Sequence, residues 1–395
     1  MPDFTNLDLL SANIKALTPT IEETAIMYGM YTAVFASRVT LLNDMKGYNI
    51  RKVSEYYRGA RAVQLTEGTA IPDQVTKRGR TNQLDPIQWG DKYALSDRMI
   101  ATNLEDISAD VIRFLADSLS MRREKSLASL INSLKTASNT ISDVANIYNV
   151  GKALGLSSEA SKRAWQADAT YHMIHPYQVQ SVRAELADLA KPADNVTRSN
   201  INRWIMSGGM GTEVVETPLL PRKITYKFGF TATAGTFKLR AGELATGAEA
   251  ITANITYSAT IATLLSNIKT ALDALAIGTW TVTGTVVTDI TVVAPHYVVA
   301  EDELSFPRLA DGTFDNALTG GVLVIQERSA VCATPFYSRN AVALDIREPF
   351  SFSNWVEMNT RTVLSSATEV YAVGEWQDDR ILFYETKCNS PFAVT

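Results

Sequence analysis

Cysteine and histidine are scarce in this sequence. The 395 residues include two cysteines and three histidines. Cys332 and Cys388 have no motif spacing, so the sequence predicts neither a disulfide framework nor a thiolate metal site. Few cysteines are typical of a reducing compartment such as the bacterial cytoplasm. We therefore expect no bound metal and no cofactor.

The sequence also lacks long apolar runs and an excess of basic residues. No run approaches the roughly 18 apolar residues of a membrane-spanning helix, and the first residues, MPDFTNLDLL, do not have the pattern of a signal peptide. Lys and Arg number 37 against 42 Asp and Glu, which gives a formal net charge of -5. A dedicated nucleic-acid-binding protein would carry a basic excess. We expect a protein made in the cytosol, without membrane contact and without specific DNA binding.

Nothing in the sequence has the pattern of an active site. His172 and His175 form the closest histidine pair, and an i, i+3 pair on a strand points to opposite faces, so the two cannot share one metal ion. His296 is far from both in sequence. No nucleophile and base stand out together, and the glycines of SGGMG (207–211) lack the GK[ST] sequence of a phosphate-binding loop. We expect structural histidines, a plain turn and no enzyme activity.

Two extended segments predict a hairpin that projects from the body of the protein. Residues 51–65 (RKVSEYYRGARAVQL) and 87–95 (IQWGDKYAL) have the composition of strands, and the segment between them is rich in Gly, Pro, Thr and charge. A hairpin of this kind has too little apolar surface to be stable alone. We expect it to lie on something else.

The strongest helical pattern covers residues 104–137. Val111, Leu115 and Leu119 recur every fourth residue, and the apolar stripe resumes at Leu127 after the polar sequence MRREK. At about 1.5 Å per residue the helix would be roughly 45 Å long. The polar interruption indicates that the helix packs in two different environments.

Residues 222–328 are rich in Thr, Ala, Val and Gly and contain a complete pattern of their own. Strands are predicted at 233–242, 250–258, 279–284 and 289–295. Between the second and third strand, Ser258 is expected to cap a helix that ends at Gly278. This unit has the size of an inserted domain, and further strands follow it.

The order of these elements resembles the tailed-bacteriophage major capsid proteins of the Hong Kong ninety-seven capsid fold. LTEGTAIPD (65–73) and IQWGDKYALSDRMI (87–100) are similar to the extended-loop tip and its return into a long spine helix. YHMIHPYQVQSVRAEL (171–186) is similar to the strand and helix of the axial domain, and SGGMGTEVVETPLLP (207–221) to the turn and strand after it. The insert resembles an immunoglobulin-like or adhesion-type module of phage structural proteins.

The resemblance implies an α+β fold made of successive regions. In sequence order these are an N-terminal arm (1–50), an extended hairpin loop (51–95), the spine helix and start of the peripheral domain (96–140), the first part of the axial domain (141–221), the inserted domain (222–328), the axial-domain return (329–347) and the C-terminal strands of the peripheral domain (348–395).

The implied function is self-assembly, through hexamers and pentamers, into the icosahedral shell of a virion. Implied partners are other copies of the chain, a scaffolding protein, a portal, a decoration or cement protein, and packaged double-stranded DNA. An encapsulin-type nanocompartment shell is an alternative, which the insert and the extra length disfavour. A surface adhesin, suggested by the Thr-rich insert, is a second alternative, which the missing signal peptide disfavours. The insert would either brace neighbouring capsomers or decorate the outer surface.

Charged residues are the candidates for contacts between subunits. Near the hairpin tip these are Lys77, Arg78 and Arg80, and near the C-terminus Glu375, Asp378 and Asp379. We expect the two groups to pair between neighbouring copies. The alternative is a solvated basic loop, because an exposed ion pair contributes only ~0–1 kcal/mol. We do not expect the covalent crosslink that some shells of this fold form, here between Lys77 and Asn354 or Asn359.

Overall fold

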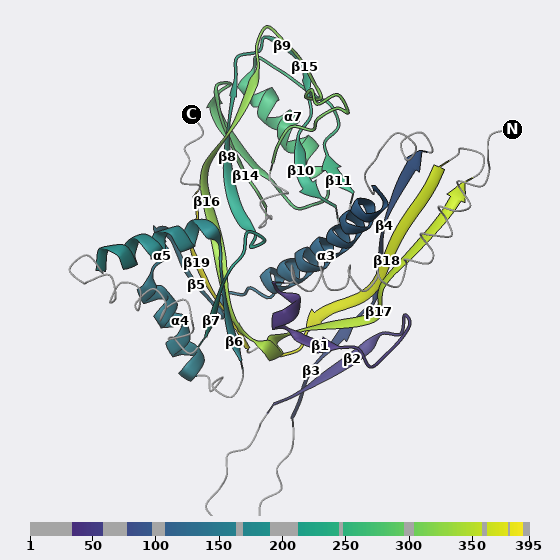
Figure 1. Ribbon diagram of the computed structural model, residues 1–395. Helices are drawn as coiled ribbons and strands as arrows, with labels where there is room; N and C mark the ends of the chain where they lie inside the picture. Colours follow the sequence, from purple (N-terminus) through teal and green to yellow (C-terminus); the bar gives the residue numbers. More distant parts are fainter. Residues whose placement is uncertain are drawn as a thin grey trace, which may run out of the picture. The chain divides into compact units, whose positions relative to one another are not determined.

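The computed structural model describes residues 34–57, 77–96, 107–162, 169–189, 212–244, 248–295, 304–357, 362–377 and 380–389. The chain passes back and forth between two compact units (Figure 1). Unit 1 comprises residues 1–134 and 338–380, and unit 2 comprises residues 135–337 and 381–395. Each unit is therefore completed by a segment distant in sequence.

Unit 1 is built on a sheet of four strands. Their order is β1 (Thr40–Leu42), β17 (Val342–Glu357), β18 (Thr362–Glu375) and β4 (Ile87–Ser96). β1 is parallel to β17, and the other neighbours are antiparallel. The predicted helix at 104–137 is confirmed as α3 (Ile107–Ser133). Its buried residues pack on the sheet in a cluster of Val111, Ile112, Leu115, Leu119, Phe352 and Ala367.

The hairpin pairs differently from the prediction. β2 (Arg51–Tyr57) pairs with β3 (Lys77–Leu84) in a two-stranded antiparallel sheet, and the two run side by side in Figure 1. The predicted partner, residues 87–95, instead forms β4 at the edge of the four-stranded sheet. Trp89 of β4 packs with the α3 cluster. This burial explains why β4 pairs with β18 rather than with β2.

Unit 2 is built on a larger sheet of eight strands. The main path is β13 (Thr281–Val286), β14 (Asp289–Val293), β8 (Arg222–Phe230), β16 (Leu323–Ser338), β19 (Ile381–Lys387) and β5 (Thr140–Ile147). β6 (Thr170–Ile174) pairs with β16 and with β7 (Glu213–Glu216). Two helices, α4 (Val150–Lys162) and α5 (Pro176–Leu189), belong to the same unit.

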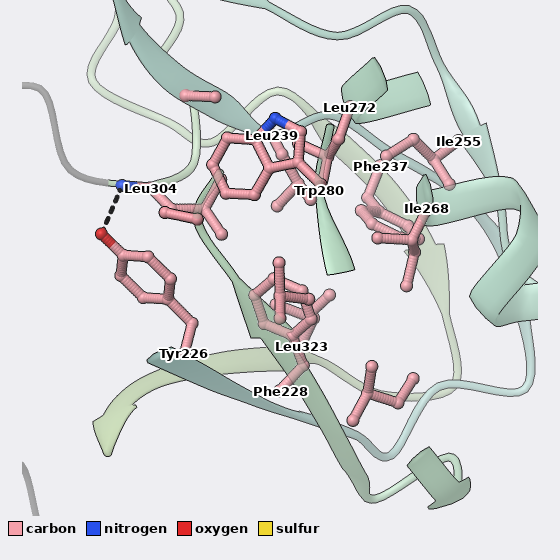
Figure 2. Packing of buried hydrophobic residues seen from close by; sticks show 14 of the residues in the cluster. Tyr226, Phe228, Phe237, Leu239, Ile255, Ile268, Leu272, Trp280, Leu304 and Leu323 are labelled. Carbon is pink, nitrogen blue, oxygen red and sulfur yellow. Dashed lines mark hydrogen bonds between the residues drawn. The ribbon is translucent and has the colours of Figure 1, made fainter. Parts of the chain in front are cut away.

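The predicted insert contributes short strands and one helix around its own core. The strands are β9 (Ala234–Phe237), β10 (Arg240–Glu243), β11 (Glu249–Ile251), β12 (Ile255–Thr256) and β15 (Asn316–Thr319), and the helix is α7 (Ile261–Asp273). Figure 2 shows Ile268 of α7 against Phe237 of β9, and the Leu304 N–H donating to the Tyr226 hydroxyl at 3.1 Å.

The helix ends of the insert differ from the prediction. Thr260, not Ser258, is the N-cap residue, and its side chain makes no capping bond. Ser258 lies two residues before it, and its Oγ accepts the Thr260 N–H at 3.2 Å. The helix ends at Asp273, before Gly278. Ala276 has a positive φ of 56°, and this left-handed residue turns the chain earlier than the glycine.

The structure divides the chain differently from the predicted regions. β8 and β16 of the supposed insert are central strands of the eight-stranded sheet, so the insert is continuous with unit 2. β19 pairs with β16 and β5, so the last strand does not belong with β17 and β18. The chain returns to unit 1 at Ser338 rather than at residue 348. A short 3-10 turn, Arg339–Ala341, separates β16 from β17, and neither Gly nor Pro marks it.

Candidate functional site

A network of charged side chains fixes the base of the hairpin to the sheet of unit 1. Arg51, the first residue of β2, donates from Nε to Asp345 Oδ2 at 2.8 Å and also binds Asp44. Arg347 Nη2 lies 2.9 Å from the same Asp345 oxygen. We call Arg51, Asp44, Asp345 and Arg347 the root network. It holds one buried carboxylate between two guanidinium groups.

Strand alternation explains why these residues meet. Asp345 and Arg347 are two positions apart on β17 and so lie on one face of the strand. Both side chains are fully buried, while that of Asp44 is 66% exposed. The hydrogen bond from Arg51 lowers the pKa of Asp44, and the bond to Asp44 raises the pKa of Arg51 despite partial burial. Asp44 and Arg51 therefore both stay charged at neutral pH.

An apolar contact fixes the second strand of the hairpin, β3, at the base. Leu84, the last residue of β3, pairs directly with Arg51 and packs on Ala343 and Ala372. A Cβ atom added to Gly374 would lie 3.0 Å from Leu84 Cδ2. A side chain at position 374 would therefore have to displace Leu84 by a few tenths of an ångström. The two ends of the hairpin are thus anchored side by side, one by charge and one by packing.

The polar interruption of the long helix is a second anchoring point. The Glu124 carboxylate accepts the backbone N–H groups of Val34, Phe35 and Ala36 at 3.0, 2.6 and 3.0 Å. Burial raises the pKa of Glu124, although these three bonds oppose the shift. Arg123 Nη1 donates to Glu369 Oε1 at 2.7 Å. The interruption therefore binds other parts of unit 1 rather than solvent.

The predicted contact residues are only partly within the described structure. Lys77, Arg78 and Arg80 belong to the backbone of β3, but their side chains lie outside the described residues, as do Asp378 and Asp379. Glu375 ends β18, half-buried, and already has a contact within the chain. The pairing between copies stays a prediction.

The crosslink candidates are likewise not brought together within the described residues. Asn354 lies in β17 opposite Ser365, but its side chain is not described. Asn359 lies outside the described residues, and so does the side chain of Lys77. The crosslink between Lys77 and either asparagine is therefore untested.

The histidines that the structure describes are held in the core of unit 2. His172 Nε2 lies 2.7 Å from the Tyr148 hydroxyl, and burial lowers the pKa of His172 to about 3, so this ring is neutral at pH 7. His175 Nδ1 accepts the Tyr177 N–H at 3.2 Å. His296 lies outside the described residues.

Two absences hold over the described ranges of the chain. In those ranges no three His, Cys, Asp or Glu side chains are grouped as metal ligands would be. None of the helices there combines the length and apolarity needed to cross a bilayer.

Sequence reasoning missed the root network and Glu124. A signal was present, because DIREP places an acid and a base two residues apart inside an apolar strand pattern. Buried charges are usually paired, so this pattern indicates a partner elsewhere. It does not indicate that the partner is Arg51, which is distant in sequence.

Solved structures share the architecture of the chain, although no family model and no curated protein matches its sequence. The capsid structure of the cyanophage P-SCSP1u is similar with a TM-score of 0.50 and 10% identity, over 91% of this chain and 89% of that one. The capsid of Ralstonia phage GP4 is similar at a TM-score of 0.47 and 9% identity, over 90% and 88%.

A virus-like particle from Pyrococcus furiosus is similar at a TM-score of 0.43 and 7% identity, over 91% of this chain and 96% of that one. The likeness to the cyanophage chain confirms the predicted α+β fold of the Hong Kong ninety-seven type.

Proposed function

We propose that this chain is a major capsid protein, many copies of which assemble into the icosahedral shell of a tailed bacteriophage. The likeness in fold to the cyanophage capsid chain carries the proposal, because it extends over 91% of this chain. A match of that extent includes residues of both units. In this proposal unit 1 is the peripheral domain and unit 2 is the axial domain.

The isolated hairpin supports assembly. β2 and β3 form a sheet of two strands, and among the described residues no other strand joins them. A two-stranded hairpin is marginally stable alone in water. The root network and Leu84 hold the base of the hairpin. The rest of the hairpin therefore needs another surface on which to pack. A neighbouring copy supplies that surface in a shell, and the basic residues Lys77, Arg78 and Arg80 would meet acidic residues there.

Many weak contacts suffice in such an assembly. Each copy touches several neighbours through heterologous interfaces, which close into rings. Hexamers and pentamers of this chain would make the shell, together with a scaffolding protein, a portal and a decoration or cement protein. Packaged double-stranded DNA would be enclosed without specific binding, in keeping with a net charge of -5. The particle would assemble in the cytoplasm of the host and persist as the virion.

Imaging of the purified chain tests the proposal. The chain is expressed in bacteria, concentrated, and examined by sedimentation velocity and negative-stain microscopy. The expected result is closed shells or rings of five and six copies. Particles that enclose DNA support the capsid, whereas particles that enclose an enzyme support the nanocompartment. A monomer at every concentration, with the amides of β2 and β3 protected from hydrogen exchange by its own body, contradicts both.

A further inference from the structure

The two cysteines of the chain meet on one face of the eight-stranded sheet, although no spacing in the sequence pairs them. Cys332 of β16 lies opposite Thr386 of β19. The Cys388 N–H donates to the Ala330 carbonyl at 2.8 Å, which continues this pairing past the end of β19. Cys388 is two positions after Thr386, so it lies on the same face as Cys332. Both thiols are buried, and they are in hydrogen-bonding contact with each other.

A buried cation lies beside this thiol pair. Arg222 of β8 is directly opposite Cys332 on the other side of β16, and it is only 3% exposed. Its guanidinium group lies 5.1 Å from the centre of the Tyr177 ring. Burial raises the pKa of a thiol, and the positive charge of Arg222 acts in the opposite direction on both cysteines. The cation therefore favours a thiolate at this place.

The first turn of α5 covers the same face of the sheet. Gln178 Nε2 donates to Thr386 Oγ1 at 2.8 Å. His175 Nδ1 accepts the Tyr177 N–H, so the ring proton is on Nε2. That nitrogen is buried and meets no nitrogen or oxygen partner among the described residues. Its hydrogen-bonding partner is the Cys388 sulfur.

The two thiols differ in acidity. Burial raises the pKa of Cys332. Burial also opposes the ionisation of Cys388, but the hydrogen bonds from Cys332 and His175 outweigh it and lower the pKa of Cys388. The thiol with the lowered pKa is the nucleophile of such a pair, and its protonated neighbour is placed to react with the oxidised product.

We propose that Cys388 and Cys332 form a peroxide-reactive pair that closes into an intrachain disulfide. The Cys388 thiolate attacks one oxygen of the peroxide, and the O–O bond breaks to give a sulfenic acid and hydroxide. The hydroxide takes a proton from solvent and becomes water. The Cys332 sulfur then attacks the Cys388 sulfur, the S–O bond breaks, and the Cys332 proton leaves with the oxygen as a second water. The two thiols lose two electrons, which reduce the peroxide.

Closure requires only a small movement at the end of β19. Diagonal neighbours on antiparallel strands have Cα atoms roughly 7–8 Å apart, and a disulfide joins Cα atoms roughly 4.4–6.8 Å apart. A shift of about 1 Å therefore suffices. The Ala330 N–H is bound at this point by the side chain of Asn389, at 2.7 Å, rather than by a backbone carbonyl. A side chain can follow such a shift.

The disulfide would enclose both crossings of the chain between the units. The chain leaves unit 2 after Tyr337 and returns at Ile381, and the two cysteines lie outside these points. The bond would thus tie β16, through which the chain leaves, to the end of β19, through which it returns. In the proposed capsid the thiols would be free in the reducing cytoplasm and oxidised in the released particle. This timing rests on the proposed function, whereas the reaction does not.

Mass spectrometry of the free subunit tests the reaction. The reduced chain is treated with hydrogen peroxide, freed of peroxide with catalase, denatured, and alkylated with iodoacetamide without a reductant. The expected chain is a monomer that has lost two hydrogen atoms, takes up no iodoacetamide, and regains both thiols in dithiothreitol. The chain contains no other cysteine, so this result assigns the bond. Two cysteines that are still alkylated after peroxide, or a bond between two chains, would overturn the proposal.

Two matched variants test the role of each thiol. Cys332→Ala leaves the nucleophile without its partner, so peroxide should produce a sulfenic acid at Cys388 that dimedone traps. Cys388→Ala removes the nucleophile, and Cys332 should then be labelled at least about tenfold more slowly. Equal labelling in the two variants contradicts the assigned roles. If a variant does not fold, the disulfide measurement on the unmodified chain decides alone.

Thermal unfolding tests whether the bond ties the strands. The oxidised chain should melt about 5 °C or more above the reduced chain, and dithiothreitol should reverse the change. An oxidised chain that melts no higher would contradict the tie between β16 and β19. All three measurements use free subunits, so a failure to form shells contradicts the proposed function and leaves this inference standing.

Discussion

A single buried carboxylate, that of Asp345, balances two guanidinium groups in unit 1. Removing one partner of a buried ion pair is strongly destabilising, because the remaining charge is left without compensation. Asp345→Asn should therefore destabilise unit 1 by about 3–5 kcal/mol, as measured by urea unfolding. Asp44→Asn is the control, since it removes an exposed member of the same network. Equal shifts in the two variants would contradict the assigned role of Asp345.

The buried carboxyl of Glu124 predicts a particular pH dependence. Burial raises the pKa of the Glu124 carboxyl above its usual range, so the folded chain holds this proton more tightly than the unfolded chain. Stability from this group is fully present below about pH 4.5 and is lost as the pH rises through the raised pKa. Glu124→Gln cannot titrate and should flatten this part of the stability profile, measured by unfolding from pH 4 to 8.

Glu369 provides the comparison for this profile. Burial also raises the pKa of Glu369, although Arg123 opposes the shift. Glu369→Gln should therefore flatten the profile in the same direction. A wild-type stability that rises throughout this pH range, with no change in Glu124→Gln, would show that the fold does not raise the pKa of Glu124.

At the scale of elements, the contact between Gly374 and Leu84 sets the position of the hairpin. Leu84 is fully buried, so it cannot move aside easily for a new methyl group. Gly374→Ala should destabilise unit 1 by about 1–3 kcal/mol through overpacking. Leu84→Ala already opens space beside position 374. Gly374→Ala should therefore reduce the free energy of unfolding less in the Leu84→Ala background than in the wild-type chain. Strict additivity in this double-mutant cycle would exclude the contact.

Periodicity predicted which segments become strands and helices, but not which strands pair. The helix at 104–137, the strand at 87–95 and the strand at 289–295 all appear with shifted ends. Alternation is the same in any strand, so it did not distinguish β3 from β4 as the partner of β2. The ion pair between Asp345 and Arg51 forms only because β2 pairs with β3 and its base lies against β17. The sequence does not indicate this pairing, so the basic tip residues were predicted and the root network was missed.

For the whole molecule, the continuity of the sheet limits how the insert can be removed. Deleting residues 222–328 would take away β8 and the first part of β16 (323–328), which are neighbours in the sheet of unit 2. Such a variant should be insoluble. Deleting 231–322 keeps both strands, because Phe230 and Leu323 pair directly and a two-residue turn can join them.

The shorter deletion still needs surface changes. Tyr226, Phe228 and Leu323 are buried in the core that the insert completes, so they would have to be replaced by polar residues. Solubility and circular dichroism are measured for the two deletions. The longer deletion should be insoluble, and the shorter one should be soluble and folded. Only a soluble short deletion can then tell whether the insert braces the shell, in which case assembly fails, or decorates it, in which case shells form.

The proposed contact between hairpin and neighbour belongs to the assembly as a whole. Arg78→Glu with Arg80→Glu reverses charge on β3 while leaving the anchoring residues Arg51 and Leu84 unchanged. Folding of the subunit should be unchanged, since exposed ion pairs contribute only ~0–1 kcal/mol each. Assembly should weaken strongly, because the same loss is repeated at every subunit contact around each ring.

Light scattering of the assembling protein measures this weakening. Added salt should also weaken the assembly of wild-type protein, because salt screens the ion pairs. Normal shells from the double variant would show that these arginines are solvated, and that packing of the hairpin alone joins the copies.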